Sequence, residues 1–478
     1  MRALELVKNN SLTVYGALAA LVYLIAAIFY RNGPQVYSRT SRELFAWFCC
    51  LTLLPLFWLG YKQVKAAAEP PLRTILVFAA LLCALAFLIF PFHSTDVFGY
   101  INRGWQQSHY GLNPYVHRLA DTPNWQQDPM LTTHWIYNPN PYGFLFSWLT
   151  LIICRIGNGH WLLTLALFKA VNVLAYAGIG WILWITGKHW ASIKPASALY
   201  LFLWNPLVLM HEIANGHNGL LTAVMVAIAV YCAIVRRYFW IIPLLMLAGF
   251  LKFAPFVLLP LAFIFVVKRT GWRTAILSTA VAIALAAAVS VPYLRDWRVL
   301  KLVDMMDNAT LVDNSLHSLL IHIFENLARV FTVLAPLHTA VNAAIKIALR
   351  AGFLCFLCYE YLRTPVDFRA RLFARKSLLI LFVLICVVSS KFNAWYLSMI
   401  LPLALMMDER DWLRTLIVAI SGAELLSLTF FKQAYMLNYF AMVLLPAWFV
   451  FRSYRRATTR NLATSAAVPS TACDAVPS

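Results

Sequence analysis

Apolar stretches long enough to cross a membrane recur along almost the whole chain, from Thr13 to Phe451. A helix needs about 20 residues to cross the roughly 30 Å of hydrocarbon in a bilayer. Of the 478 residues, 62% are hydrophobic and only 12% are charged, whereas a soluble globular chain carries about 25% charged residues. The sequence therefore predicts an all-α polytopic membrane protein, with no soluble domain large enough to carry its function alone.

The apolar segments predict one transmembrane domain over residues 1–452, with roughly 12–16 transmembrane segments. The apolar segments are 13–30, 43–60, 73–92, 143–187, 196–210, 219–235, 241–266, 273–292, 338–362, 377–390, 396–407, 411–429 and 435–451. We expect 241–266 to be a hairpin of short helices that turns near Lys252 and Pro255, because proline removes a helix hydrogen bond. Residues 453–478 are rich in Ala, Thr, Ser and Pro, which predicts a disordered cytoplasmic tail.

The basic residues give the expected orientation. The formal net charge is +20, and most of the basic residues fall in short connectors between apolar runs, as they do in the cytoplasmic connectors of membrane proteins. No basic face carries interleaved base-stacking aromatic residues, which argues against nucleic-acid binding. In this orientation 93–142 is a large extracytoplasmic loop after the third span, and 211–218, 293–320 and 391–396 fall on the same outer side.

The most informative polar stretch begins with Asp96, at the end of the third span. A carboxylate at the mouth of a span is partly desolvated, which raises its basicity and suits it to take a proton from a hydroxyl. Arg103 lies two helical turns further on the same face, where it could hold a phosphate by forked hydrogen bonds. The structural alternative is a helix N-cap at Ser94, Thr95 or Asp96 beside an interfacial aromatic belt.

The outer loop is rich in aromatic rings, among them Tyr100, Tyr115 and Tyr142. Flat rings suit the apolar face of a sugar, but an aromatic belt at the headgroup level is the commoner reason for any one ring. The loop histidines lack the tight spacing of metal ligands, so no metal site is predicted, and a divalent cation stays open as a cofactor.

A polar turn lies between two later apolar segments and contains Asn215, His217 and Asn218. Polar groups at that depth are expensive without a function. A structural turn in which asparagine and glycine satisfy helix ends explains Asn215 and Asn218 equally well. His211 and His217, with Glu212 between them, do not have the spacing of a zinc-binding helix.

Two further lysines stand out. Lys252 lies inside an apolar run, and Lys391 closes another span and is followed by Trp395 and Tyr396. Either lysine could meet a lipid phosphate. The structural alternatives are snorkelling of Lys252 to the interface and anchoring of a helix end by Lys391.

Taken together, these stretches resemble the bacterial and archaeal branch of the GT-C glycosyltransferases, in particular polyprenyl-phosphate-mannose-dependent α-mannosyltransferases of the mycobacterial lipoglycan type. The resemblance spans most of the chain. It rests on Ser94-Thr-Asp96-Val-Phe-Gly-Tyr100, Arg103-Gly104, Gly111-Leu-Asn113-Pro114-Tyr115, Pro141-Tyr142-Gly143, Asn215-Gly216-His217-Asn218, Lys252 with Pro255, and Trp395-Tyr396.

The resemblance implies a GT-C-like fold and a catalytic base at Asp96. It also implies a lipid-phosphate-linked hexose as donor, and donor-phosphate binding is expected at Arg103, Lys252 and Lys391. The residues expected to contact substrate are Tyr100, Asn113, Tyr115, Tyr142, Asn215, His217, Asn218, Trp395 and Tyr396.

The chain departs from the family pattern at two positions. Relatives tend to read Tyr-Gly-Pro where this chain has Phe144 last, and Asn-Gly-His-Asn-Asp where it has Gly219 last. A second carboxylate is therefore missing from the turn that ends at Gly219, which puts in doubt any role of that turn in metal or acceptor binding.

The leading hypothesis is an inverting transfer of a hexose, with mannose favoured, from polyprenyl phosphate to a lipid-linked or glycan acceptor. It would occur on the outer face of a multi-pass protein in the bacterial plasma membrane, in contact with membrane lipids. A lipid-sugar flippase or transporter is the main alternative, since such proteins also place ionisable residues within the membrane. A polysaccharide ligase or polymerase would share the large outer loop.

Overall fold

The computed structural model describes residues 2–31, 38–138, 140–190, 192–296, 298–299, 314–426 and 438–454. All regular secondary structure in these ranges is helical. The expected tail at 453–478 lies, except for its first two residues, outside the described part of the chain, as do residues 300–313 of the expected outer stretch 293–320.

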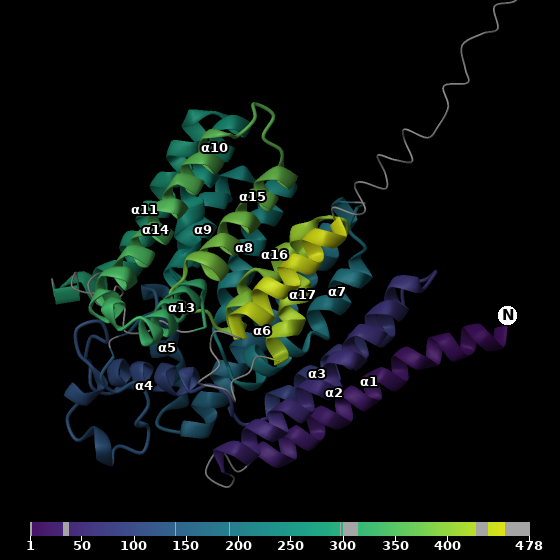
Figure 1. Ribbon diagram of the computed structural model, residues 1–478, viewed down its shortest axis with the longest axis horizontal. Helices are drawn as coiled ribbons and strands as arrows, with labels where there is room; N and C mark the ends of the chain where they lie inside the picture. The colour runs from purple at the N-terminus through teal and green to yellow at the C-terminus, as the bar shows by residue number, and fades with distance from the viewer. Residues whose placement is uncertain are drawn as a thin grey trace, which may run out of the picture.

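The first half of the chain contributes eight of the described α-helices and three short helices. They are α1 (Arg2–Tyr30), α2 (Arg39–Ala66), α3 (Leu72–Leu88), α4 (Asp96–Ser108), η1 (Leu119–Asp121), η2 (Trp125–Gln127), α5 (Phe144–Gly157), α6 (Trp161–His189), α7 (Pro195–Leu203), η3 (Val208–Ala214) and α8 (Gly219–Ile234). α1, α2 and α3 lie side by side along one edge of the molecule (Figure 1).

The second half continues the bundle with α-helices that are broken by short helical turns. They are η4 (Tyr238–Trp240), α9 (Ile241–Leu251), η5 (Ala254–Leu258), α10 (Leu259–Thr270), α11 (Trp272–Leu294), α13 (Leu316–Val330), η7 (Thr332–Leu337), α14 (His338–Leu362), α15 (Ala370–Val383), η8 (Leu384–Val388), η9 (Ala394–Met399), α16 (Leu401–Leu405), α17 (Trp412–Ala423), η10 (Glu424–Leu426) and η12 (Phe440–Leu444).

Five of the described helical stretches are long and apolar enough to cross a membrane, and a sixth span is formed if η3 and α8 count as one segment bent by 111°. The five are Ser11–Tyr30, Thr40–Ala66, Trp161–His189, Trp272–Leu294 and Thr332–Leu362. Large apolar side chains on their outward faces are exposed, for example Leu174 at 72% and Trp181 at 64%. These observations confirm an all-helical polytopic membrane protein.

The hairpin predicted for residues 241–266 is confirmed. α9 ends at Leu251, the C-cap residue Lys252 has an extended backbone, and η5 begins at Ala254. Tyr238, just before α9, contacts the ring of Phe265 in α10 with 5.7 Å between ring centroids. The two helices are therefore antiparallel, and the turn brings Lys252 to the end of the bundle that carries the outer loop.

The basic connectors gather at the opposite end of the bundle. Arg269, at the end of α10, lies 3.3 Å from Asp367, and Arg371 lies over the ring of Trp190 at 5.4 Å. This clustering of connectors agrees with the charge pattern in the sequence and separates a basic end from the end that carries α4 and the rest of the outer loop (Figure 1).

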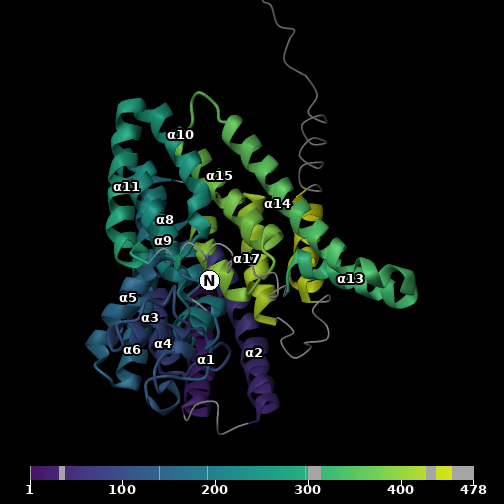
Figure 2. The same ribbon diagram turned by 90° about the vertical axis from the view of Figure 1, so that its left-hand side faces the viewer.

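α13 was not predicted as a helix, since its first residues were assigned to an outer loop. It projects sideways from the bundle (Figure 2), and Leu320, Ile323 and Leu327 expose an apolar stripe along it. Their spacing of three and four residues is that of an amphipathic helix. At 15 residues the helix is too short to be recognised by a search for spans of about 20 apolar residues.

A buried ion pair joins α14 to α15. Lys376 donates to a carboxylate oxygen of Glu360, and the two side chains are only 11% and 10% exposed. We expect Lys376→Met to lower the free energy of unfolding by about 3–5 kcal/mol, because it leaves an uncompensated buried charge. Thermal unfolding in detergent measures this, and adding Glu360→Gln should recover much of the loss. Equal destabilisation by the single and double variants would contradict the prediction.

Candidate functional site

The four stretches predicted to share one side meet at one end of the bundle. Asn215, in the turn after η3, accepts hydrogen bonds at its Oδ1 from the backbone N–H groups of Phe92 at 2.9 Å and His93 at 2.8 Å. Ser315 donates to the Ser390 carbonyl at 2.7 Å. The first of these links joins segments more than 120 residues apart, and the second joins segments 75 residues apart.

Asp96 is the first residue of α4. Its backbone N–H donates to the Ser94 hydroxyl at 3.2 Å. The N-cap residue Thr95 makes no side-chain capping bond, and its hydroxyl instead accepts from the indole N–H of Trp135 at 3.2 Å. The Asp96 carboxylate is therefore placed where the helix dipole favours a negative charge, and its side chain remains 18% exposed.

The turn that follows η3 brings His217 to Asp96, with 3.3 Å between Nδ1 of His217 and a carboxylate oxygen of Asp96. Gly216 makes this possible because its φ of +73° lies in a region that other residues rarely adopt. Asn172 of α6 holds the turn, since its amide donates to the carbonyls of Glu212 at 3.1 Å and His217 at 2.8 Å.

Aromatic rings close around this pair. The ring of His217 stacks on Trp395 at 4.2 Å with an interplanar angle of 13°. His93 and His211 meet edge to face at 5.2 Å, and each also contacts Trp395. Burial, with a smaller effect from the charge of His217, lowers the pKa of His93 to about 4, so His93 is neutral near pH 7.

Two lysines lie near enough to Asp96 for their charges to act on it. Lys252 sits over the ring of Tyr396 at 4.7 Å, and Lys391 sits over the ring of Trp135 at 6.0 Å. Burial disfavours the charged carboxylate of Asp96, but the contact with His217 and the charges of Lys252 and Lys391 outweigh it. The pKa of Asp96 is consequently lowered from its ordinary value.

Three of the expected site residues lie outside this cluster. Arg103 is buried, and its guanidinium donates to the carbonyls of Asn138 and of Trp135, the latter at 3.0 Å. The Asn113 amide donates to the Tyr293 carbonyl at 2.9 Å. The Tyr115 hydroxyl donates to the Tyr142 carbonyl at 2.8 Å. These side chains hold the outer loop together and fasten it to the bundle.

The remaining expected residues lie close to Asp96 or line the same turn. Tyr100 is 2% exposed and meets the ring of Tyr142 edge to face at 5.1 Å. Asn218 is buried at the N-cap of α8. Asn215 and His217 are both buried. The partly exposed members of the expected substrate set are Asn113, Tyr142, Trp395 and Tyr396, and only the three aromatic ones lie in this cluster.

Glu212 is a second carboxylate in this cluster, and it was not predicted from the sequence. It is fully buried, accepts a hydrogen bond from the Ser398 hydroxyl, and accepts the Leu220 N–H at 3.1 Å. A Cβ at Gly219 would meet the Glu212 carboxylate and the Ser398 hydroxyl. The space next to residue 219 therefore holds a carboxylate that arrives from seven residues earlier in the chain, and only the fold reveals this.

No three His, Cys, Asp or Glu side chains come together as a metal centre would require within the residues that the structure describes. Asp96 lies 3.3 Å from Nδ1 of His217, and Glu212 accepts a hydrogen bond from Ser398. The arrangement suits proton transfer at Asp96 and anion binding at the two lysines.

Comparison with known proteins identifies the family. A profile described as alpha-(1->6)-mannopyranosyltransferase, N-terminal domain, matches residues 14–269. The chain belongs to this family. The matched region contains Asp96, Glu212, His217 and Lys252, and the resemblance inferred from the motifs is thereby confirmed.

Two relatives of this chain are named as alpha-(1->6)-mannopyranosyltransferases. The chain is 28% identical over 173 residues to "Alpha-(1->6)-mannopyranosyltransferase A" of Corynebacterium glutamicum, covering 36% of this chain and 34% of the relative. It is 29% identical over 187 residues to a "Probable alpha-(1->6)-mannopyranosyltransferase" of Mycolicibacterium smegmatis, covering 37% and 32%. The chain thus spans about a third of the length of each relative. No solved structure matches it.

The close approach at Gly219 gives a test of the site. We expect Gly219→Ala to destabilise the protein by about 1–3 kcal/mol, because overpacking displaces the Glu212 carboxylate and the Ser398 hydroxyl. Gly352→Ala in α14 is the matched control, since a Cβ there meets nothing within 4 Å and alanine favours a helix. Thermal unfolding in detergent compares the two. A Gly219→Ala variant as stable as Gly352→Ala would contradict the packing described here.

Proposed function

We propose that this chain is an inverting mannosyltransferase that uses a polyprenyl-phosphate-linked mannose as donor. The acceptor is a lipid-linked or glycan hydroxyl on the outer face of the bacterial plasma membrane. Family membership supports the reaction class, and the activity is otherwise carried over from relatives that match only part of the chain. The observation that carries the proposal is a partly exposed carboxylate, Asp96, which contacts His217 and lies within reach of the charges of Lys252 and Lys391.

In the proposed step Asp96 takes the proton from the acceptor hydroxyl as its oxygen attacks the anomeric carbon of the donor sugar. The bond between that carbon and the phosphate oxygen breaks, and its electron pair leaves with polyprenyl phosphate. Attack opposite to the leaving group inverts the anomeric centre. A positioned carboxylate that accepts the proton in the transition state typically contributes a rate factor of about 10²–10⁴.

Lys252 and Lys391 are proposed to hold the donor phosphate. The leaving group changes from a phosphodiester to a phosphomonoester, so its negative charge grows during the step. Cations fixed where this charge develops stabilise the transition state more than the ground state. Arg103 is the weaker candidate for this role, because its guanidinium is buried against loop carbonyls.

We propose substrate contacts at the partly exposed rings of Tyr142, Trp395 and Tyr396, whose flat faces suit the apolar face of a sugar. Tyr100, Asn113, Tyr115, Asn215 and Asn218 would then support these contacts from behind. A GT-C-like architecture with roughly 12–16 segments remains part of the proposal. The short apolar helices between the longer spans, such as Leu72–Leu88 and Phe144–Gly157, are consistent with that number.

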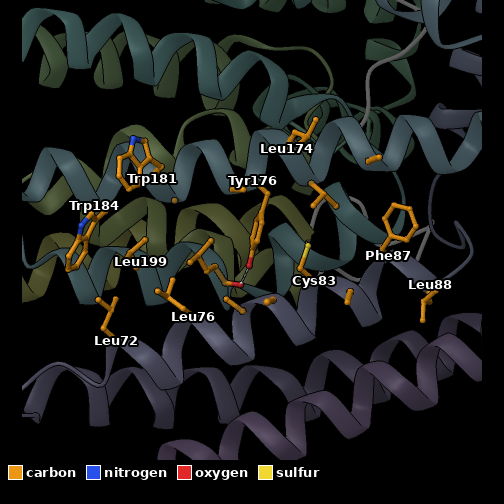
Figure 3. A pocket seen from close by; sticks show the side chains of 18 residues that line it. Leu72, Leu76, Cys83, Phe87, Leu88, Leu174, Tyr176, Trp181, Trp184 and Leu199 are labelled. Atoms are coloured by element: carbon orange, nitrogen blue, oxygen red, sulfur yellow. Dashed lines mark hydrogen bonds between the residues drawn. The ribbon is translucent and has the colours of Figure 1, made fainter. Parts of the chain in front are cut away.

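A groove on the membrane-facing side supports a lipid-linked donor. It has a volume of about 1010 Å³ and lies between α3 and α6, with α7 at its base (Figure 3). Small side chains on both helices, such as Ala80, Ala84 and Ala177, leave the slot open. From Leu72 to Leu88 it follows α3 for roughly 24 Å, most of the hydrocarbon thickness, and α3 leads directly into the segment that carries Asp96. We propose that the isoprenoid chain of the donor lies there.

The base assignment is tested by Asp96→Asn. We expect this variant to lose at least about a hundredfold in kcat for mannose transfer from a polyprenyl-phosphate donor, since the amide cannot accept the proton. Purified protein in detergent suffices, and transfer without a sealed vesicle separates an enzyme from a transporter. Asp121→Asn is the matched control, because that carboxylate lies in the same loop in an exposed pair with Arg118. Full activity of Asp96→Asn would refute the assignment.

The groove is tested by the length of the donor chain. We expect Ala84→Phe to raise KM about tenfold for a long polyprenyl donor, since a blocked slot loses the burial of about two methylene groups. KM for a two-unit geranyl donor should stay near the wild-type value. Ala351→Phe, on an exposed face of α14, is the control. An equal rise in KM with both donors would indicate that the isoprenoid chain lies elsewhere.

A further inference from the structure

We infer that His217 is a positioning residue that fixes the direction and the proton affinity of the Asp96 carboxylate. This inference rests on the proposed function, because it takes Asp96 as the base. It assigns to His217 a role behind the base instead of a contact with the sugar.

The exposure of the two side chains separates their roles. The side chain of His217 is 1% exposed, whereas that of Asp96 is 18% exposed. An acceptor hydroxyl can therefore reach Asp96 but not His217. The 3.3 Å contact joins Nδ1 of His217 to one carboxylate oxygen of Asp96, so Nδ1 is the ring atom that faces the base, and the other oxygen is left for substrate.

The ring of His217 is held rigidly in this orientation. Trp395 stacks on one face at 4.2 Å, and the backbone of His217 is fixed by the Asn172 amide at 2.8 Å. Gly216 brings the turn against Val97, since a Cβ at Gly216 would lie 3.1 Å from a Val97 methyl. A ring packed in this way can hold Asp96 in one direction, as the orienting partner of a catalytic base must.

The same turn also fixes the backbone under Asp96. Asn215 accepts hydrogen bonds from the N–H groups of Phe92 and His93. His217, two residues later in the same turn, contacts the Asp96 side chain. One turn thus contacts both the backbone that leads into Asp96 and the Asp96 side chain. A purely structural histidine would not need to face the carboxylate.

The charges around Asp96 explain why this contact matters for the reaction. Burial alone would favour the protonated acid, and His217, Lys252 and Lys391 oppose it. A donor phosphate bound at the two lysines would neutralise their effect on Asp96, which leaves His217 as the partner that keeps the base ionised. The titratable and charged groups that face the pair are His93, His211, Glu212, Lys252 and Lys391.

The experiment compares the pH dependence of kcat/KM between pH 4 and pH 8 for wild-type protein, His217→Asn and His217→Ala. The asparagine amide can still donate from about the position of Nδ1, whereas alanine removes the contact. Loss of the contact raises the pKa of Asp96, so the acid limb of the profile should move up by about one to two pH units in His217→Ala. His217→Asn should show a smaller movement.

His211→Asn is the matched control, because His211 belongs to the same buried cluster but does not contact Asp96. We expect its acid limb to coincide with that of wild type, whatever its rate. Thermal unfolding in detergent establishes that each variant is folded. A lower rate in His217→Ala with an unmoved acid limb would overturn the inference, since a structural role alone predicts that result. Absence of mannose transfer by wild-type protein would instead refute the proposed function.

Discussion

The site depends on the hydrogen bonds between the side chain of Asn215 and the backbone that leaves α3. Where a helix ends near the membrane, its connector carries N–H groups that water does not reach, and each one left unsatisfied is costly. Asn215 accepts two of them, from Phe92 and His93. This fixes the path of the chain into α4, and with it the position of Asp96. It also ties the early part of the chain to the turn after η3, so that neither half of the site is built without the other.

α6 provides the same kind of support from within the bilayer. Lys169 donates to the carbonyl of Ile89 at 2.7 Å and to that of Phe87, and Asn172 donates to two carbonyls of the turn before α8. A polar residue inside a span is usually taken as a sign of function. Here both act on backbone carbonyls that no helix satisfies. They support the reaction only indirectly, by holding Asp96 and His217 at a fixed distance.

Polar residues in this protein serve either the proposed reaction or the packing of the backbone. This limits which of their roles can be predicted from the sequence. The spans around α1, α2 and α6 are predicted from apolar length, and Asp96 is predicted from its place at the end of a span. Arg103 and Lys391 look alike in the sequence, since each is a cation near the end of an apolar run. In the structure Arg103 donates to loop carbonyls, whereas the charge of Lys391 acts on Asp96. Such partners lie far away in the chain, so spacing alone could not distinguish the two.

Glu212 shows that residue type alone does not reveal the role of a side chain. Relatives tend to have an aspartate where this chain has Gly219. In the structure the carboxylate of Glu212 lies against that glycine. Asp96 and Glu212 are chemically similar and lie in one cluster, but the Asp96 side chain is 18% exposed and Glu212 is fully buried. A hydroxyl from solvent can reach only the first. In the proposed mechanism, this difference in exposure favours Asp96 over Glu212 as the group that exchanges a proton with substrate. Glu212 binds Ser398 and the start of α8, and so fixes the turn from which His217 reaches Asp96.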